Sequence, residues 1–340
     1  MATYTGYKYK LIELRHMAKE IMLSAKIAMK SPHMQRPVTK DRKPLCIAMV
    51  DGETFHGGMC DRFKGIISLY AYCKCVDLPF RIRYTFPFRL EDYLVPAHYD
   101  WTLKDGEYTD NPLYHRVLYM RGEHRATRLL NFHPSRQVHF YTNRDLLPHI
   151  IDRFCDASVG RYDWGALYRE LFKPAPVLQE RIDNILGEIG GEYDAAVFRF
   201  QNLLGDFKEY HFKELQEKAQ AESLLAKCVD YVKQMRKTSP GKMLLVTSDS
   251  ITFLRRVSQI SGVYVIPGTL SHMDCTKHGD APANAVDGYL KSFLDFYMIS
   301  KARKVYRVGT PLMYHSEFPC MPQKSTTVHL KVLPFKPLKR

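Results

Sequence analysis

Glycines and ionisable side chains gather directly after the first long apolar run of the chain, Cys46–Val50. The ionisable residues are Glu53, His56, Asp61 and Arg62, and the glycines between them are Gly57 and Gly58. A strand, a glycine loop and a helix in this order place ligands at the carboxyl end of a strand and at a helix N-terminus. A carboxylate or an imidazole there could act as a general base. The alternative is a tight turn without a ligand.

Polar residues also follow apolar strands in the second half of the chain. They are Arg199 and Asp206, then Ser248, Asp249 and Ser250, and finally His315 and Ser316. The planar fork of an arginine can donate two hydrogen bonds to a diphosphate, and serine hydroxyls and helix N-termini could add to them. The alternative for Arg199 is a buried side chain that only pairs with Asp206.

The elements that must position these residues alternate between strands and helices. The predicted strands are 46–50, 80–86, 137–141, 195–200, 242–248, 263–266 and 304–308, and the main helices are 8–30, 61–72, 211–237 and 285–301. Strands separated by helices predict mostly parallel sheets. The expected class is α/β, with two Rossmann-like domains facing a central cleft.

The double glycine Gly190-Gly191 is the expected domain boundary. The predicted divisions are a helix and basic linker (1–45), an N-terminal domain (46–189), a C-terminal domain (190–320) and a basic tail (321–340).

The first predicted helix, residues 8–30, is amphipathic. One face carries Leu11, Leu14, Ala18, Ile21, Ala25 and Ala28, and most of the basic residues lie off it. The favoured interpretation packs this face on the body of the protein, since no Trp or Phe anchors it. The alternative is a basic helix that rests on an anionic membrane surface.

Composition indicates an ordinary globular protein: of 340 residues, 45% are hydrophobic and 25% are charged. A net charge of +14 indicates an anionic partner. The cysteines form no CxxC pair, and no apolar leader is visible. No apolar run approaches the ~18 residues of a membrane span. These observations predict a cytoplasmic protein. The alternative prediction is a cytoplasmic protein that binds peripherally to the inner membrane.

Several classes lose support because their motifs are missing. The chain has no GxxxxGK[ST] loop, clean GxGxxG, GxSxG or HExxH, which disfavours ATPases, ordinary dehydrogenases, serine hydrolases and zincins. It has no recognised nucleic-acid motif, so we expect no nucleic-acid partner. His272, Asp274, His278 and Asp280 share one loop with irregular spacing, so loop polarity is favoured over a metal site.

Ordered motifs along about 46–320 resemble the fucosyltransferase superfamily of GT-B glycosyltransferases, near the bacterial α-1,2 and α-1,6 members and the protein O-fucosyltransferases. They are Gly57-Gly58-Met-Cys-Asp61-Arg62-Phe-Lys-Gly65-Ile66, the strand that ends in Arg199, Ser248-Asp249-Ser250, the helix 287–300, and Tyr314-His315-Ser316-Glu317-Phe318. The chain departs from the family pattern around Arg199. The family usually has a His-x-Arg motif there, whereas this strand reads Phe198-Arg199-Phe200-Gln201. The second departure is Ser250, which stands where the family often has the second aspartate of a Ser/Thr-Asp-Asp motif.

The resemblance implies an inverting transfer of fucose from GDP-fucose, without a metal or another cofactor. It also implies that the GT-B-like domain 46–189 is the acceptor side and that the domain 190–320 binds the nucleotide sugar. The implied donor-binding residues are Gly57, Gly58, Arg62, Arg199, Asp206, Ser248, Asp249, Ser250, His315 and Ser316, and the candidate bases are Glu53, His56 and Asp61. The implied acceptor is a glycan or a lipid-linked oligosaccharide in surface polysaccharide or lipopolysaccharide synthesis. The alternatives are a different nucleotide sugar, a non-catalytic glycan- or nucleotide-binding protein, and a basic RNA-binding protein.

Overall fold

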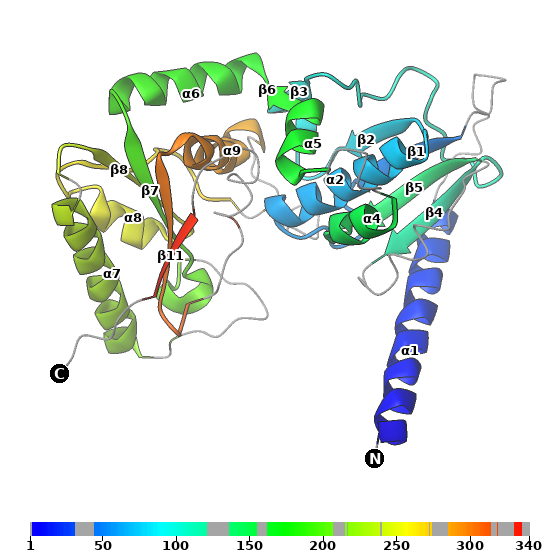
Figure 1. Cartoon of the computed structure of the whole chain (residues 1–340), viewed down its shortest axis with the longest axis horizontal. Coiled ribbons are helices and arrows are strands. Elements are labelled where there is room, and N and C mark those ends of the chain that lie inside the picture. Colours follow the sequence, from blue (N-terminus) through cyan, green and yellow to red (C-terminus); the bar gives the residue numbers. More distant parts are fainter. Residues whose placement is uncertain are drawn as a thin grey trace. The chain divides into compact units, whose positions relative to one another are not determined.

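The computed structural model describes residues 2–30, 44–120, 136–154, 162–206, 215, 217–238, 240–271, 273, 285–313, 318 and 330–334. They belong to two compact units (Figure 1). Unit 1 comprises Met1–Lys173 and Met273–Ala281, and unit 2 comprises Pro174–His272 and Pro282–Arg340. The division precedes the expected one at Gly190-Gly191, because helix α6 (Pro176–Ile189) packs against α9 (Ala285–Lys301) within unit 2.

Unit 1 is built on a parallel sheet of order β2-β1-β5-β4. Its strands are β1 (Leu45–Val50), β2 (Phe80–Tyr84), β4 (His115–Met120) and β5 (Gln137–Thr142). Strand β1 is buried along its whole length, which is why it reads as a continuous apolar run. Strand β2 lies at the edge and alternates between buried and partly exposed residues.

Helices and short elements complete unit 1. They are α1 (Ala2–Met29), α2 (Met59–Cys75), α4 (Leu147–Phe154), α5 (Trp164–Leu171), the 3-10 turn η1 (Leu90–Asp92), and the paired strands β3 (Leu94–Pro96) and β6 (Phe172–Pro174). Helix α2 crosses the sheet so closely that a Cβ on Gly65 would lie 2.0 Å from the carbonyl oxygen of Thr142. This crossing positions the N-terminus of α2, and with it Asp61 and Arg62.

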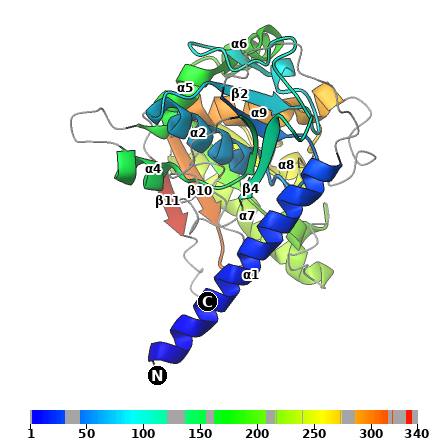
Figure 2. The ribbon, with the colours of Figure 1, turned by 90° about the vertical axis from the view of Figure 1, so that its right-hand side faces the viewer.

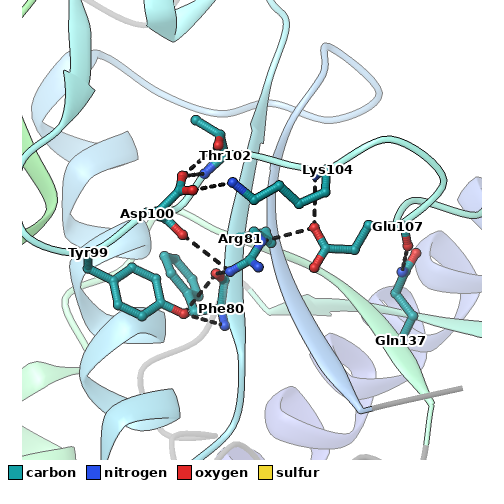
Figure 3. A network of polar contacts seen from close by, with 8 residues as sticks. All are labelled: Phe80, Arg81, Tyr99, Asp100, Thr102, Lys104, Glu107 and Gln137. Carbon is teal, nitrogen blue, oxygen red and sulfur yellow. Dashed lines mark hydrogen bonds and ion pairs between the residues drawn. The ribbon is translucent and has the colours of Figure 1, made fainter. Parts of the chain in front are cut away.

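The segment after β3, which showed no period in the sequence, covers the free edge of β2 (Figure 3). The carbonyl of Trp101 accepts the N–H of Ile82 at 2.9 Å. On β2 itself, Arg81 Nε donates to Glu107 Oε2 at 2.9 Å, and Gln137 on β5 donates to the Glu107 carbonyl at 2.6 Å. The edge of the sheet is therefore paired with the chain's own backbone.

Helix α1 contacts the sheet only near its C-terminal end, and Figures 1 and 2 show it running on beyond the sheet of its own unit. Ile27 is buried against Leu45, Ile47 and Met49, with Leu23 and Ala28 beside it. In contrast, Leu14 is 58% exposed and Ile21 is 56% exposed. The helix therefore packs on the body of the protein, as predicted, but it does so mainly through the Leu23–Ile27 face, and most of the predicted face is exposed.

Unit 2 contains a second parallel sheet, of order β11-β10-β7-β8-β9. Its elements are β7 (Tyr193–Phe198), β8 (Met243–Ser248), β9 (Val263–Tyr264), β10 (Lys304–Gly309), β11 (Leu330–Pro334), the 3-10 turn η3 (Gln201–Leu204), α6, α7 (Lys218–Thr238), α8 (Ile251–Val257) and α9. Strand β11 falls in the segment 321–340, which was expected to be only a basic tail. It pairs in parallel with β10, so this part of the segment completes the sheet.

Candidate active site

The strand ends of unit 2 bring two of the predicted residues together. Strands β7 and β8 are hydrogen-bonded neighbours, and Phe198 is in register with Ser248. The next residue on each strand therefore lies at the same edge of the sheet. Arg199 Nη1 is 3.1 Å from Asp249 Oδ2, with 29% of the arginine side chain and 7% of the aspartate side chain exposed.

The Asp249 carboxylate is held in one orientation by the chain that follows β7. The backbone N–H groups of Phe200 and Gln201 each donate to one of its oxygens at 2.8 Å. Gln201 has a φ of 52°, which turns the chain back over the carboxylate. Asp249 is thus one partner of Arg199, while the described contacts of Asp206 are with Ser250 and Thr252.

Asp206 instead ties the turn after β7 to the start of α8. Its Oδ1 accepts from the N–H of Thr252 at 3.2 Å and from the Thr252 hydroxyl at 2.6 Å, and its Oδ2 accepts from the Ser250 hydroxyl. Ser250 Oγ also caps α8 by accepting the N–H of Phe253 at 3.0 Å. Ser248 Oγ accepts the N–H of Ser250 at 3.1 Å. These side chains fix the strand ends, and Arg199 is partly exposed beside them.

In unit 1, Arg62 organises the loop after β1. The residue is only 2% exposed. Nε donates to the Gly57 carbonyl at 2.8 Å, and Nη1 donates to the Tyr84 hydroxyl at 2.9 Å and to the Phe86 carbonyl at 2.8 Å. Nη2 donates to the carbonyl of Met273. These contacts assign Arg62 a positioning role, and its direct contact with a donor remains a prediction.

His56 is buried beside this loop, and its basic nitrogen is engaged. The N–H of Gly52 donates to His56 Nε2 at 3.2 Å, so the ring carries its proton on Nδ1. Burial first, and the charge of Arg62 next, lower the pKa of His56 and keep the ring neutral at pH 7. In this geometry His56 supports the loop, and its lone pair is used by the N–H of Gly52.

The two carboxylate candidates in the loop are more accessible. Glu53 is 38% exposed at its side chain and lies 2.8 Å from Lys30 Nζ at the end of α1. Asp61, in the first turn of α2, is 46% exposed and lies 3.1 Å from Lys64 Nζ. Gly57, at a φ of 74°, lets the chain pass close to Asp61, because a Cβ there would lie 2.9 Å from Asp61 Oδ2.

Asp51 is a site residue that the sequence analysis left out. Its carboxylate accepts from the Tyr141 hydroxyl at 2.7 Å and from the N–H of Glu53 at 3.1 Å, and Arg83 Nη1 lies 3.6 Å away. Burial alone would raise its pKa, but the nearby His56 ring, 3.8 Å away, and the hydrogen bonds from Tyr141 and the Glu53 N–H outweigh burial and lower it. Its position in the sequence could have identified it, because Asp51 is the first residue after β1.

Next to Asp51, planar groups stack beneath the segment that covers the sheet. The Arg83 Cζ atom lies 4.8 Å from the centre of the Tyr108 ring. The ring centres of Tyr108 and His139 are 4.9 Å apart, and those of His139 and His115 are 4.3 Å apart. His139 Nε2 is 2.9 Å from Gln137 Oε1, an acceptor that also receives the N–H of Thr109. Burial lowers the pKa of both histidines, and for His139 the neighbouring charges of His115 and Arg83 lower it further.

This stack predicts that unit 1 loses stability in mild acid. A histidine in the unfolded chain takes up a proton near pH 6.5, whereas His115 and His139 resist protonation when folded. Stability is therefore complete above about pH 6.5 and falls below it, by up to about 1.4 kcal/mol per pH unit for each histidine. Urea unfolding at pH 7.5 and 5.5 checks this. His139→Gln should flatten the dependence, and an unchanged slope in that variant would contradict the assignment.

Other predicted residues lie outside the described residues. These are His315 and Ser316 of the donor set, and His272, Asp274, His278 and Asp280 of the loop tested for a metal. Within the described part of the chain, no group of three or more His, Cys, Asp or Glu side chains is placed to hold a metal ion. Among the described helices, none combines the length and apolar character needed to cross a membrane.

Comparisons with known proteins place the architecture in one class. No protein-family profile and no curated protein sequence matches the chain. Solved structures do match, and they show that the fold is the GT-B-like α/β arrangement with Rossmann-like units. The predicted fold class, and the resemblance to fucosyltransferases at the level of the fold, are confirmed.

The particular structures that it resembles are fucosyltransferases. An arginine-to-lysine variant of FUT1 from Arabidopsis thaliana, in complex with GDP, has a TM-score of 0.55 at 12% identity and covers 96% of this chain and 79% of its own. The fucosyltransferase NodZ from Bradyrhizobium has a TM-score of 0.50 at 12% identity, covering 83% and 93%. A NodZ α-1,6-fucosyltransferase crystal soaked with GDP-fucose gives 0.50 at 13% identity, covering 83% and 92%.

Proposed function

We propose that this protein is a glycosyltransferase that transfers fucose from GDP-fucose to a glycan acceptor. The observation that carries the proposal is the arrangement of Arg199 and Asp249 at the ends of β7 and β8. A partly exposed guanidinium is held 3.1 Å from a carboxylate that two backbone amides fix in place. Such a pre-oriented cation suits a diphosphate at the carboxyl edge of a parallel sheet.

The donor assignment draws support from the structural neighbours. FUT1 and NodZ structures that share this fold were solved with GDP and with GDP-fucose. By analogy of fold, unit 2 holds the nucleotide and the diphosphate, with Ser248, Asp249, Ser250 and Asp206 shaping the turn that presents Arg199. His315 and Ser316 complete the proposed donor set from the sequence.

In the proposed reaction, an acceptor hydroxyl oxygen attacks the anomeric carbon of the donor while the bond to the diphosphate breaks. One displacement of this kind inverts the anomeric centre, and GDP leaves with the bonding electron pair. Arg199 stabilises the charge that develops on the departing diphosphate. The hydroxyl proton passes to a carboxylate, either Glu53 or Asp61, which are the accessible carboxylates of the loop after β1. The proposed reaction uses no metal.

The proposed acceptor is a glycan or a lipid-linked oligosaccharide in surface polysaccharide or lipopolysaccharide synthesis, and the proposed location is the cytoplasm. The net charge of +14 fits an anionic donor and an acceptor that carries a lipid diphosphate. A non-catalytic binding protein of the same fold is the second candidate. It is favoured by His56, whose Nε2 is used inside the loop.

The test is a thermal-shift screen with GDP, UDP, CDP, ADP, GDP-fucose and GDP-mannose, with and without magnesium, followed by measurement of GDP release with glycan acceptors. A ligand at a hundredfold excess over Kd adds about 2.7 kcal/mol to the stability of the state that binds it. We expect stabilisation by GDP and GDP-fucose that is indifferent to magnesium. Stabilisation by UDP alone would reject fucose, and binding without GDP release would favour the second candidate.

A further inference from the structure

Helix α1 has three distinct faces along its described length. The face on the protein carries Glu20, Leu23, Ser24 and Ile27, and Ser24 Oγ accepts the N–H of Tyr119 at 3.1 Å. Spacings of three and four residues place these side chains on one side of the helix. The remaining two faces point away from the sheet.

The second face is an apolar stripe, which consists of Leu14, Ala18, Ile21, Met22, Ala25 and Met29. All six residues are exposed, and the large ones are strongly so: Met22 is 67% exposed and Met29 is 78% exposed. Contiguous exposed apolar side chains on a helix mark a surface that another body covers. No described residue of unit 1 packs on this stripe, and Figure 2 shows the N-terminal part of the helix running out beyond its own unit.

The third face is a basic stripe, which consists of Arg15, Lys19 and Lys26. It runs beside the apolar stripe along the same helix, and all three side chains are exposed. The only acidic residue with a described side chain in α1 is Glu20, which is buried on the opposite side. The free surface of α1 is therefore apolar along one line and positive along the next.

We infer that α1 docks the protein on an anionic lipid bilayer, with the apolar stripe in the headgroup region and the basic stripe on the lipid phosphates. A helix that combines an apolar face with Lys and Arg on the neighbouring face lies in the plane of such a surface. This inference goes beyond the proposed reaction and does not depend on it. It differs from the favoured sequence interpretation in that most of the predicted apolar face is exposed, although α1 also packs on the sheet.

Charge complementarity favours a lipid surface over a second copy of the chain. If two copies packed their apolar stripes together, the basic stripes would lie side by side with no described acidic side chain between them. An anionic bilayer supplies an apolar layer and negative charge together. Each Lys or Arg near such a surface strengthens binding about fivefold.

The experiment is flotation of the full chain with vesicles of phosphatidylcholine alone and of phosphatidylcholine with 30% phosphatidylglycerol. We expect binding only to the anionic vesicles, with weaker binding at high salt. Removing the basic stripe with Arg15→Gln, Lys19→Gln and Lys26→Gln should weaken binding about a hundredfold. A matched control changes three exposed lysines of unit 2, Lys237→Gln, Lys301→Gln and Lys304→Gln, and should bind nearly as the original does.

A second variant reports on the apolar stripe directly. Met22→Trp places a fluorophore at an exposed position, so folding should be unaffected and the emission should shift to the blue on anionic vesicles. Failure to float on anionic vesicles, or equal losses in the two triple variants, would overturn the inference. A dimer that Ile21→Asp converts to a monomer would also overturn it, in favour of a second copy on the stripe.

Discussion

Replacing Arg199 with alanine is expected to lower kcat for glycosyl transfer by about 10²–10³-fold. Removal of one preorganised group that stabilises developing charge typically costs that much. Arg199 is held by Asp249 and presents 29% of its side chain to solvent. Its loss would therefore remove the positive charge that stabilises the departing diphosphate. Steady-state kinetics with GDP-fucose, together with GDP binding by calorimetry, measures the effect.

Two variants separate a role in binding from a role in folding. Arg256→Ala removes a guanidinium from an exposed pair with Glu222 in the same unit and should leave both kcat and GDP affinity unchanged. Arg199→Lys keeps the charge but loses the planar fork, so we expect an intermediate loss. If Arg199→Ala lowers the melting temperature while GDP affinity and kcat persist, the arginine serves only the turn after β7.

Gly65→Ala is expected to destabilise unit 1 by about 3 kcal/mol, beyond most insertions of a methyl group into a packed core. The added Cβ would lie 2.0 Å from the Thr142 carbonyl oxygen, which is backbone and cannot rotate away. Helix α2 must therefore move off β5. A fall in melting temperature of about 6–12 °C would register this change in a unit of this size. Activity should fall too, because α2 carries Asp61.

Gly187→Ala is the matched control for that experiment. Gly187 also lies within a helix, α6, but a Cβ there meets nothing within 4 Å. Alanine should therefore stabilise unit 2 slightly, by about 0.5–1 kcal/mol, through backbone entropy and helix propensity. If Gly65→Ala also raised the melting temperature, the close crossing of α2 over β5 would be wrong.

The central strands could be predicted because their burial is written into continuous apolar runs. Strand β1 is buried on both faces, and β7 is too, so both stand out in the sequence. Strand β4 was missed because its mixed pattern, with His115 and Arg116 at its start, follows no simple period. Strand β11 was missed because Lys331 and Pro334 interrupt a short run within a basic segment.

The candidate site was predictable residue by residue but not pair by pair. Arg199 and Asp249 each follow a strand, which the sequence indicates, but their contact depends on the register between β7 and β8. The roles of Arg62 and His56 depend on backbone groups, which carry no sequence signal. For α1, periodicity identified an apolar face but could not determine which face meets the sheet.

The carbonyl of Met273, to which Arg62 donates, belongs to a stretch that returns to unit 1 after the chain has begun unit 2. Each unit is therefore made of two separate segments of the chain. Cutting the gene after codon 173 would produce a fragment whose most buried guanidinium lacks one of its acceptors. A functional N-terminal half would need that returning stretch supplied as a second piece, and a circular permutant would have to keep all three passages of the chain between the units.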